Sequence, residues 1–378
     1  MNDDRRRRRP TMIDVAKLAG VSQSSVSLVL NNMTGARISE ATRRRVRAAA
    51  QEIGYQLGPR GREPLPPSGP VARTLIGYLV DEISTSPHPV QSVDGARDAA
   101  WEHDCVLAVF ATRGDSELEE QVLRALVANP ALVGVVYSTI FTRKVEVPAL
   151  LGAVPTVLLN CYDGARALPS VVPGEVAGGH TATEHLIQAG HRRIGFINGE
   201  PWMDAARDRF KGYRQALATA DLPFDPALVR DGDWSPSTGY AHTLSLMREK
   251  RPPTAIFCAN DLMAVGCYEA LKELGLRIPT DVAVMGYDDQ EIAQHVRPAL
   301  TTVLLPNYEM GRWAVEHLVA DAIHGRAPRL LQVKMDSPLV ARDSVRPVAQ
   351  RPAEDAPPAE AARPDRSLPD RPLEAGRA

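Results

Sequence analysis

Apolar residues follow two different patterns along this chain of 378 residues. Between Pro10 and Tyr55 they recur every three or four positions, which is typical of amphipathic helices. Beyond residue 73 they form short continuous runs, such as TLIGYLV, CVLAVFAT, VPTVLLN and TAIFCAN, separated by helix-like stretches. Continuous apolar strands that alternate with helices indicate parallel sheets covered on both faces. The pattern therefore predicts an all-α N-terminal unit followed by an α/β core.

The N-terminal pattern divides into three short helices. The first begins after Thr11 and ends at Gly20, a residue suited to a tight turn. Ser22 can cap the second helix and Ser39 the third, because serine side chains accept hydrogen bonds from the free N–H groups of a first turn. This spacing predicts a small helix-turn-helix bundle.

Composition marks the boundaries between the expected units. The core of about 270 residues exceeds one comfortable hydrophobic core, so we divide it into two subdomains with ligand space between them. We expect a disordered basic arm at 1–10, the helical unit at 11–57, a Pro/Gly-rich linker at 58–72, a core at 73–344 and a disordered tail at 345–378. Within the core, we assign about 73–172 and 302–332 to the first subdomain, and about 173–301 and 333–344 to the second.

Charge and cysteine content restrict the function. The net charge of −2 hides a basic region in the first fifty residues, which contain RRRRRP and ATRRRVRAAA and so suggest a polyanionic partner. No apolar run approaches the roughly 20 residues that span a bilayer, and the arginine-rich start lacks a secretory signal, so we expect a cytoplasmic protein. The four cysteines lack CxxC spacing and are expected to be buried free thiols, without a metal site or cofactor.

The segment VSQSSVSLVLNN has small and polar residues in the first turn of the second helix. A helix that enters the DNA major groove needs such a surface there. Gln23 can pair with an adenine edge, Ser22, Ser24 and Ser25 can bind phosphates or base edges, and Leu28 can touch a thymine methyl. The alternative is a solvated helix with serine caps, which leaves the preceding TMIDVAKLAG and the basic third helix unexplained.

Polar residues follow several of the expected strands: Asp81, Asn160, Asn260 and Asp288. In open α/β sheets, ligands bind beyond the carboxyl ends of the strands. These side chains can bind hydroxyls, and Trp234 can offer a flat face to a sugar ring, so they indicate a polyol site. Each also has a local alternative, as a helix cap, a strand end or part of the core.

Taken in order, these motifs resemble the lactose-repressor (LacI/GalR) family of bacterial transcription regulators. The matching stretches are TMIDVAKLAGVSQSSVSLVLNN, ISEATRRRVRAAAQEIGY, GHRRIGFING, CANDLMAVG, IPTDVAVMGYDD and LTTV, between Thr11 and about Ser344. The resemblance implies a core like that of periplasmic binding proteins. It assigns base reading to Gln23, Ser24 and Leu28, and phosphate or framework contacts to Thr11 and Asn31.

The same resemblance implies an effector site. The matching positions that line the sugar cleft are Asp81, Asn160, Arg209, Trp234, Asn260 and Asp288. Arg209 and Asp288 are the strongest candidates for effector contacts, because each can hold two oxygens of one ligand.

We also include Arg37 among the DNA-binding residues.

Three features depart from the family pattern. Leu28 stands where many members carry arginine, and the loop NMTGAR is longer than in many relatives. Members usually have a hinge helix that inserts a leucine into the minor groove, but the prolines at 59, 64, 66 and 67 argue against that helix here.

We therefore predict a homodimeric DNA-binding repressor of carbohydrate genes, controlled by a sugar or related polyol, and no enzymatic activity. One alternative is a transport-type sugar-binding protein, which requires export. Another is a glycoside hydrolase that uses two carboxylates such as Asp81 and Asp288. The sequence lacks GxxxxGK[ST], GxSxG, and GxGxxG after the first strand of the core, which disfavours other common enzymes.

Overall fold

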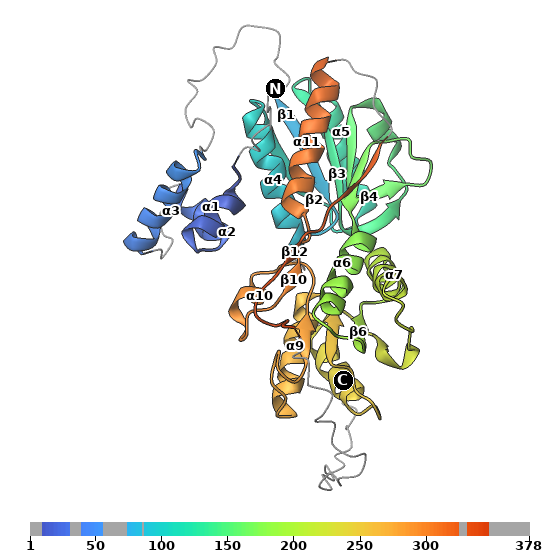
Figure 1. The fold of residues 1–378 in the computed structure, drawn as a ribbon. Helices are drawn as coiled ribbons and strands as arrows, with labels where there is room; N and C mark the ends of the chain where they lie inside the picture. The colour runs from blue at the N-terminus through green and yellow to red at the C-terminus, as the bar shows by residue number, and fades with distance from the viewer. Residues whose placement is uncertain (1–9, 31–38, 56–73, 85–86, 325–330, 348–378) are drawn as a thin grey trace, which may run out of the picture.

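The computed structural model describes residues 10–30, 39–55, 74–84, 87–324 and 331–347. A helical headpiece lies beside the upper of two α/β subdomains, which are stacked one above the other (Figure 1). Residues 1–9 of the expected arm at 1–10, the linker at 58–72, and residues 348–378 of the expected tail at 345–378 lie outside the described residues. Asn31 and Arg37 also lie outside them.

The headpiece contains the three expected helices, α1 (Met12–Ala19), α2 (Gln23–Leu30) and α3 (Glu40–Glu52). Thr11 caps α1 in a reciprocal capping box with Asp14, and Gly20 ends the helix in a left-handed conformation with φ of 63°. The Ser39 hydroxyl caps α3 by accepting the N–H of Thr42. Buried side chains from all three helices form one core: Met12, Val15, Ala16, Ala19, Val26, Val29, Val46, Ala49 and Ala50.

The first subdomain is built on a six-stranded parallel sheet with the order β11-β5-β4-β3-β1-β2. Its strands are β1 (Leu75–Val80), β2 (Val106–Ala111), β3 (Leu132–Val145), β4 (Thr156–Asp163), β5 (Ser170–Pro173) and β11 (Gln332–Met335). Helices α4 (His88–Glu102) and α11 (Asn307–His324) cover one face, and α5 (Ser116–Val127) with η1 (Ala149–Ala153) covers the other. Strands β1, β4 and β5 are largely buried on both faces, which accounts for their continuous apolar runs, whereas the edge strand β2 is partly exposed.

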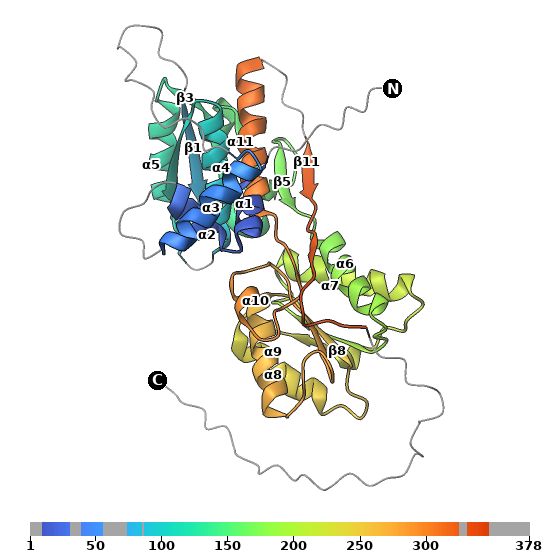
Figure 2. The same ribbon diagram turned by 60° about the vertical axis from the view of Figure 1, so that its left-hand side comes forward.

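The second subdomain has a four-stranded parallel sheet with the order β7-β6-β8-β9. Its strands are β6 (Ile194–Asn198), β7 (Val229–Asp231), β8 (Ala255–Cys258) and β9 (Ala283–Met285). Its helices are α6 (Glu175–Gln188), α7 (Asp204–Thr219), η2 (Pro226–Leu228), α8 (Pro236–Met247), α9 (Asp261–Glu273) and α10 (Ile292–His295). Figure 2 shows the α6–α7 pair on one side of the sheet and the α8–α9 pair on the other.

The chain passes between the subdomains through segments that include the short antiparallel pair β10 (Thr302–Val303) and β12 (Leu339–Val340). The expected boundary at residues 332/333 lies too early, because β11 pairs with β5 throughout in the first sheet. The boundary expected at residue 302 also lies too early, since Val303 and Leu305 pack in the core of the second subdomain. Strand-like sequence alone does not show which of two sheets a short strand joins.

The four cysteines are free and buried, as expected, and none of the described helices is long and apolar enough to cross a membrane.

Helices α4 and α11 cross at unusually close range. A Cβ atom at Gly95 would overlap the carbonyl oxygen of Tyr308, and one at Gly311 would overlap that of Ser92. Each helix therefore contributes a glycine where the backbone of the other approaches.

Candidate DNA-binding headpiece and effector cleft

The second headpiece helix presents one apolar and one polar face. Val26 and Val29 are fully buried against the other helices, whereas Gln23, Ser25 and Ser27 remain partly exposed. The Ser22 hydroxyl accepts the N–H of Ser25 at 3.2 Å and lies 3.0 Å from the Ser25 hydroxyl. Ser22 and Ser25 thus shape the first turn, and Gln23 has the longest polar side chain on it. The side chains of Ser24 and Leu28 lie outside the described part of the chain.

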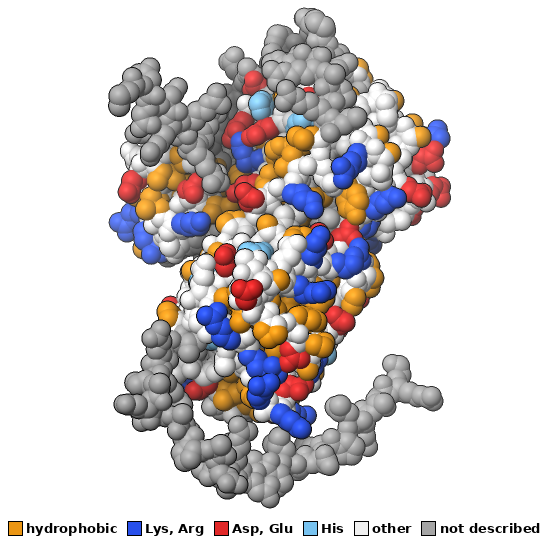
Figure 3. Space-filling model, turned by 45° about the vertical axis from the view of Figure 1, so that its right-hand side comes forward, with side chains coloured by type: hydrophobic (Ala, Val, Ile, Leu, Met, Phe, Trp, Pro, Cys, Tyr) orange, Lys and Arg blue, Asp and Glu red, His pale blue; other side chains and the backbone are white. Residues whose placement is uncertain are grey.

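Basic residues in the headpiece lie on the neighbouring helices. Arg44, Arg45 and Arg47 on α3, together with Lys17 on α1, are exposed. Such residues supply the salt-dependent attraction to phosphates that any DNA-binding unit needs. On the face of the molecule seen in Figure 3, basic and acidic side chains alternate over the core without a large patch of one sign.

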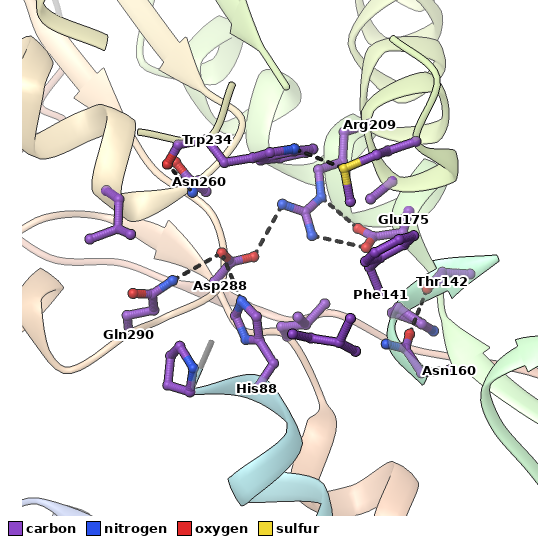
Figure 4. A pocket seen from close by; sticks show the side chains of 17 residues that line it. His88, Phe141, Thr142, Asn160, Glu175, Arg209, Trp234, Asn260, Asp288 and Gln290 are labelled. Atoms are coloured by element: carbon purple, nitrogen blue, oxygen red, sulfur yellow. Dashed lines mark hydrogen bonds and ion pairs between the residues drawn. The ribbon is translucent and has the colours of Figure 1, made fainter. Parts of the chain in front are cut away.

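A cavity of about 250 Å³ lies between the two subdomains. Arg209, Trp234, Asn260 and Asp288 line it from the second subdomain, and Asn160 lines it from the first (Figure 4). The remaining lining residues are Pro87, His88, Ile140, Phe141, Thr142, Pro173, Glu175, Met203, Ala205, Leu262, Gln290 and Leu305. The structure therefore brings together five of the six residues expected in the effector site, a role that remains a prediction.

Arg209 on α7 is almost fully buried. Its Nε and Nη2 donate to the two carboxylate oxygens of Glu175, at 2.7 and 2.9 Å, and its Nη1 donates to the carbonyl of Ala259. The guanidinium carbon lies 3.7 Å from the ring centre of Tyr287. Burial alone would lower the pKa of Arg209, but Glu175 and then Asp288 outweigh it and raise that pKa. The arginine is a permanent cation held in a fixed orientation.

Asp288 lines the cavity beside Arg209 (Figure 4). Its Oδ1 is 3.1 Å from Nη1 of Arg209, and its Oδ2 is 3.5 Å from Nε2 of His88 and accepts from Gln290 at 3.3 Å. Burial would raise the pKa of Asp288, but Arg209 and then His88 outweigh it, so the pKa lies below its ordinary value. Although buried, Oδ1 accepts no well-aligned hydrogen bond from any described residue. This oxygen is held by its ion pair with Arg209 and not by an aligned hydrogen bond.

Three of the cleft residues have left-handed backbone conformations. The φ angle is 58° at Asn160, 68° at Trp234 and 102° at Asp288. Such conformations are unfavourable for residues other than glycine, and they gather at binding sites where surrounding contacts hold them. The contacts are present: Asn160 accepts from Thr142 at 2.6 Å, and the Trp234 carbonyl accepts from Asn260 at 3.0 Å.

Asn260 both caps a helix and lines the cavity, the two roles expected for it from the sequence. Its Oδ1 caps α9 by accepting the N–H of Met263 at 2.8 Å, while its side chain also lines the cavity. Trp234 lies against Gly199 and donates its Nε1–H to the sulfur of Met203 at 2.9 Å. The indole is therefore held in place as one wall of the cleft.

Asp81 does not line the cavity. Its Oδ1 accepts the N–H groups of Ile140 and Glu82 at 2.7 and 2.9 Å, and its Oδ2 lies 2.8 Å from Arg143. These contacts tie the end of β1 to the far part of β3, where Ile140 and Phe141 line the cavity. In this structure Asp81 supports the wall of the cavity and has no contact with its interior.

Sequence reasoning missed Glu175, His88 and Phe141. Glu175 follows β5 after a single glycine, so the argument about polar residues beyond strand ends would have found it. His88 begins α4 after a proline, and Phe141 lies within an apolar run. Neither of these two gives a signal in the sequence, because only the meeting of the subdomains brings them to the cavity.

Comparison with known proteins agrees with this architecture. Residues 11–57 match the family described as bacterial regulatory proteins, lacI family, and residues 183–345 match a periplasmic binding protein-like domain. The ribose operon repressor of Haemophilus influenzae is 33% identical over 319 residues, which cover 82% of this chain and 91% of that protein. This chain belongs to the lacI family of bacterial regulatory proteins. It is a transcriptional regulator with a DNA-binding headpiece, in a family made up of regulators.

Two solved structures of family members resemble this member along most of its length. The transcriptional regulator CelR–cellobiose complex is 30% identical, with a TM-score of 0.60, and the alignment covers 89% of this chain and 100% of that one. The lac repressor dimer bound to operator and the anti-inducer ONPF is 28% identical, with a TM-score of 0.61, and the alignment covers 90% and 100%. The described residues contain no group of three or more His, Cys, Asp or Glu side chains placed to hold a metal ion.

Proposed function

We propose that this lacI family member represses carbohydrate genes as a cytoplasmic homodimer and responds to a sugar or related polyol bound between its core subdomains. The observation that carries the proposal is the cavity that contains Arg209, Asp288, Asn160 and Trp234. Aromatic walls with a few fixed polar groups suit the alternating apolar faces and hydroxyls of a sugar. The CelR–cellobiose complex and the ribose operon repressor are sugar-related by name and support this class of effector.

A second candidate, a two-carboxylate glycoside hydrolase, has weaker support. Its mechanism needs two carboxyl groups on either side of the scissile bond. Asp81 lies outside the cavity, and both oxygens of Glu175 are occupied by Arg209. Asp288 is the one other carboxylate among the described lining residues, and it is ion-paired with Arg209, so the described cavity lacks a free pair of catalytic carboxyl groups.

Contacts across the cleft suggest how an effector would act. Tyr162 from the first subdomain donates to Asp204 of the second at 2.8 Å, and the rings of Phe141 and Trp202 meet edge to face at 5.5 Å. His88 reaches Asp288 across the same gap. A ligand that binds Asp288 competes with His88, and thereby changes the relative free energies of open and closed cleft arrangements. In a dimer, that change alters the separation of two headpieces that contact one operator.

A thermal-shift screen tests the effector class. We expect the melting temperature to rise with one or a few neutral sugars, because a ligand that binds only the folded state stabilises it. A concentration of about 100 times Kd should add roughly 2.7 kcal/mol. Amino acids and nucleobases serve as comparison ligands. Stabilisation by these ligands and by no sugar would contradict the proposed effector class.

We expect Gln23→Ala to weaken operator binding by about 1–3 kcal/mol and to relax the preference at one base pair, as the loss of a paired base contact does. Selection of randomised half-sites by the wild type and the variant measures both effects. Lys17→Ala, a change in an exposed basic residue of α1, is the matched control and should weaken binding equally for all sequences. If Gln23→Ala weakened binding equally for all half-site sequences, Gln23 would contact a phosphate and not a base.

A further inference from the structure

Arg209 is the one arginine or lysine among the described residues that line the effector cavity, and two buried carboxylates lie beside it. Of the described lining residues, the ionisable ones are Arg209, Glu175, Asp288 and His88. Arg209 is one cation against two buried carboxylates, so these three residues leave an excess of one negative charge. A further carboxyl group lies behind the cavity on Asp261, where burial and then the charge of Asp288 raise its pKa well above the ordinary value. The surroundings of Asp288 thus oppose additional negative charge.

Glu175 also controls the direction of the arginine fork. An unpaired guanidinium facing a cavity would favour a phosphate or carboxylate, which it binds through two parallel hydrogen bonds. Here Glu175 occupies that position, with both oxygens within 2.9 Å of Arg209 nitrogen atoms. The remaining Nη1 is directed to Ala259 and Asp288. Figure 4 shows the pair along one wall, with Asp288 on the other side of the guanidinium.

The carboxylate of Asp288 supplies hydrogen-bond acceptors beside the cavity. Its Oδ1 is ion-paired with Nη1 of Arg209 at 3.1 Å, and its Oδ2 lies 3.5 Å from Nε2 of His88 and accepts from Gln290 at 3.3 Å. A buried carboxylate oxygen is stabilised by a hydroxyl or N–H donor and destabilised by another anion. The cavity therefore favours a ligand that donates hydrogen bonds to Asp288.

We infer that Glu175 is a specificity-determining residue, which restricts the effector to neutral, hydroxyl-donating sugars and excludes phosphorylated or acidic ones. This inference rests on the proposed function. Glu175 acts by cancelling the charge of Arg209 and by occupying the fork that an anion would bind. Glu175 thus disfavours anionic ligands, while Asp288 favours ligands that donate hydrogen bonds.

The test compares neutral and anionic members of matched sugar pairs on the full-length protein by calorimetry at constant ionic strength. The pairs are glucose with glucose 6-phosphate, ribose with ribose 5-phosphate, galactose with galacturonate, and cellobiose with cellobionate. For the wild type, we expect every bound pair to favour the neutral sugar by at least about tenfold. Glu175→Gln keeps the size of the side chain and removes its charge, so it should shift this ratio toward the anion by about tenfold or more.

Glu184→Gln is the matched control, because Glu184 lies on the same helix with its side chain 48% exposed. It should leave the ratio unchanged. Tighter binding of any anionic member by the wild type would overturn the inference but leave a sugar-responsive regulator in place. Equal weakening of both members by Glu175→Gln would also overturn it, since the residue would then have only a structural role. The wild-type comparison stands even if the variant does not fold, and binding of neither class would contradict the proposed function itself.

Discussion

Replacing Arg209 with alanine should lower the free energy of unfolding by about 3–5 kcal/mol, because it leaves two buried carboxylates without their cation. Glu175 would lose both hydrogen bonds from the guanidinium, and Asp288 its nearest positive charge. The same variant should lose its response to sugar, while the headpiece, which has its own core, should still bind operator in the absence of sugar. Urea unfolding and mobility-shift titrations with and without sugar measure the two effects.

Lys211→Ala is the control for this prediction, since Lys211 is exposed on the same helix. It should change neither stability nor response. An Arg209→Ala protein with wild-type stability would show that the carboxylates do not depend on the arginine. If a folded Arg209→Ala protein failed to bind operator in the absence of sugar, the headpiece would not act independently of the cleft.

The second large effect is expected at the crossing of α4 and α11. Gly95→Ala places a methyl group where the carbonyl of Tyr308 lies, so the helices must separate, at a cost of about 3 kcal/mol. His88 and Asn307 begin these two helices, and their side chains are 3.3 Å apart. We therefore also expect weaker effector binding, because His88 would shift relative to Asp288.

Gly152→Ala is the matched control, because a Cβ atom there would have no neighbour within 4 Å. Urea unfolding and sugar titration of both variants test the prediction. Equal stabilities of the two variants would show that the helix crossing adapts without loss. A destabilised Gly95→Ala protein with unchanged sugar affinity would show that the crossing of α4 and α11 does not influence the effector site.

Local patterns in the sequence were sufficient to predict the headpiece. The capping residues Thr11, Ser22 and Ser39, the left-handed Gly20 and the apolar spacing of Val26 and Val29 all act within a few residues. The alternation of apolar runs with helices was likewise sufficient for two parallel sheets. Asn160, Asn260 and Asp288 line the cavity near the carboxyl ends of parallel strands, whereas Arg209 lies on α7 and was expected there from the family resemblance.

Long-range packing decided what those patterns left open. β11 pairs with β5 across more than 150 residues of sequence, so the boundary between subdomains differs from the expected one. Asp81 follows a strand as the other residues do, but its hydrogen bond to Ile140 directs it into the wall.

By itself, the sequence determined the headpiece and the class of the core, because periodicity and capping depend on near neighbours, and it identified five of the seventeen residues that line the cavity. Only the tertiary structure decided that Glu175 pairs with Arg209 and that His88 reaches Asp288. These pairings join side chains 34 and 200 positions apart. The Glu175–Arg209 pair depends on how α6 packs against α7, and the His88–Asp288 pair depends on how the two subdomains meet, so local spacing predicts neither pair.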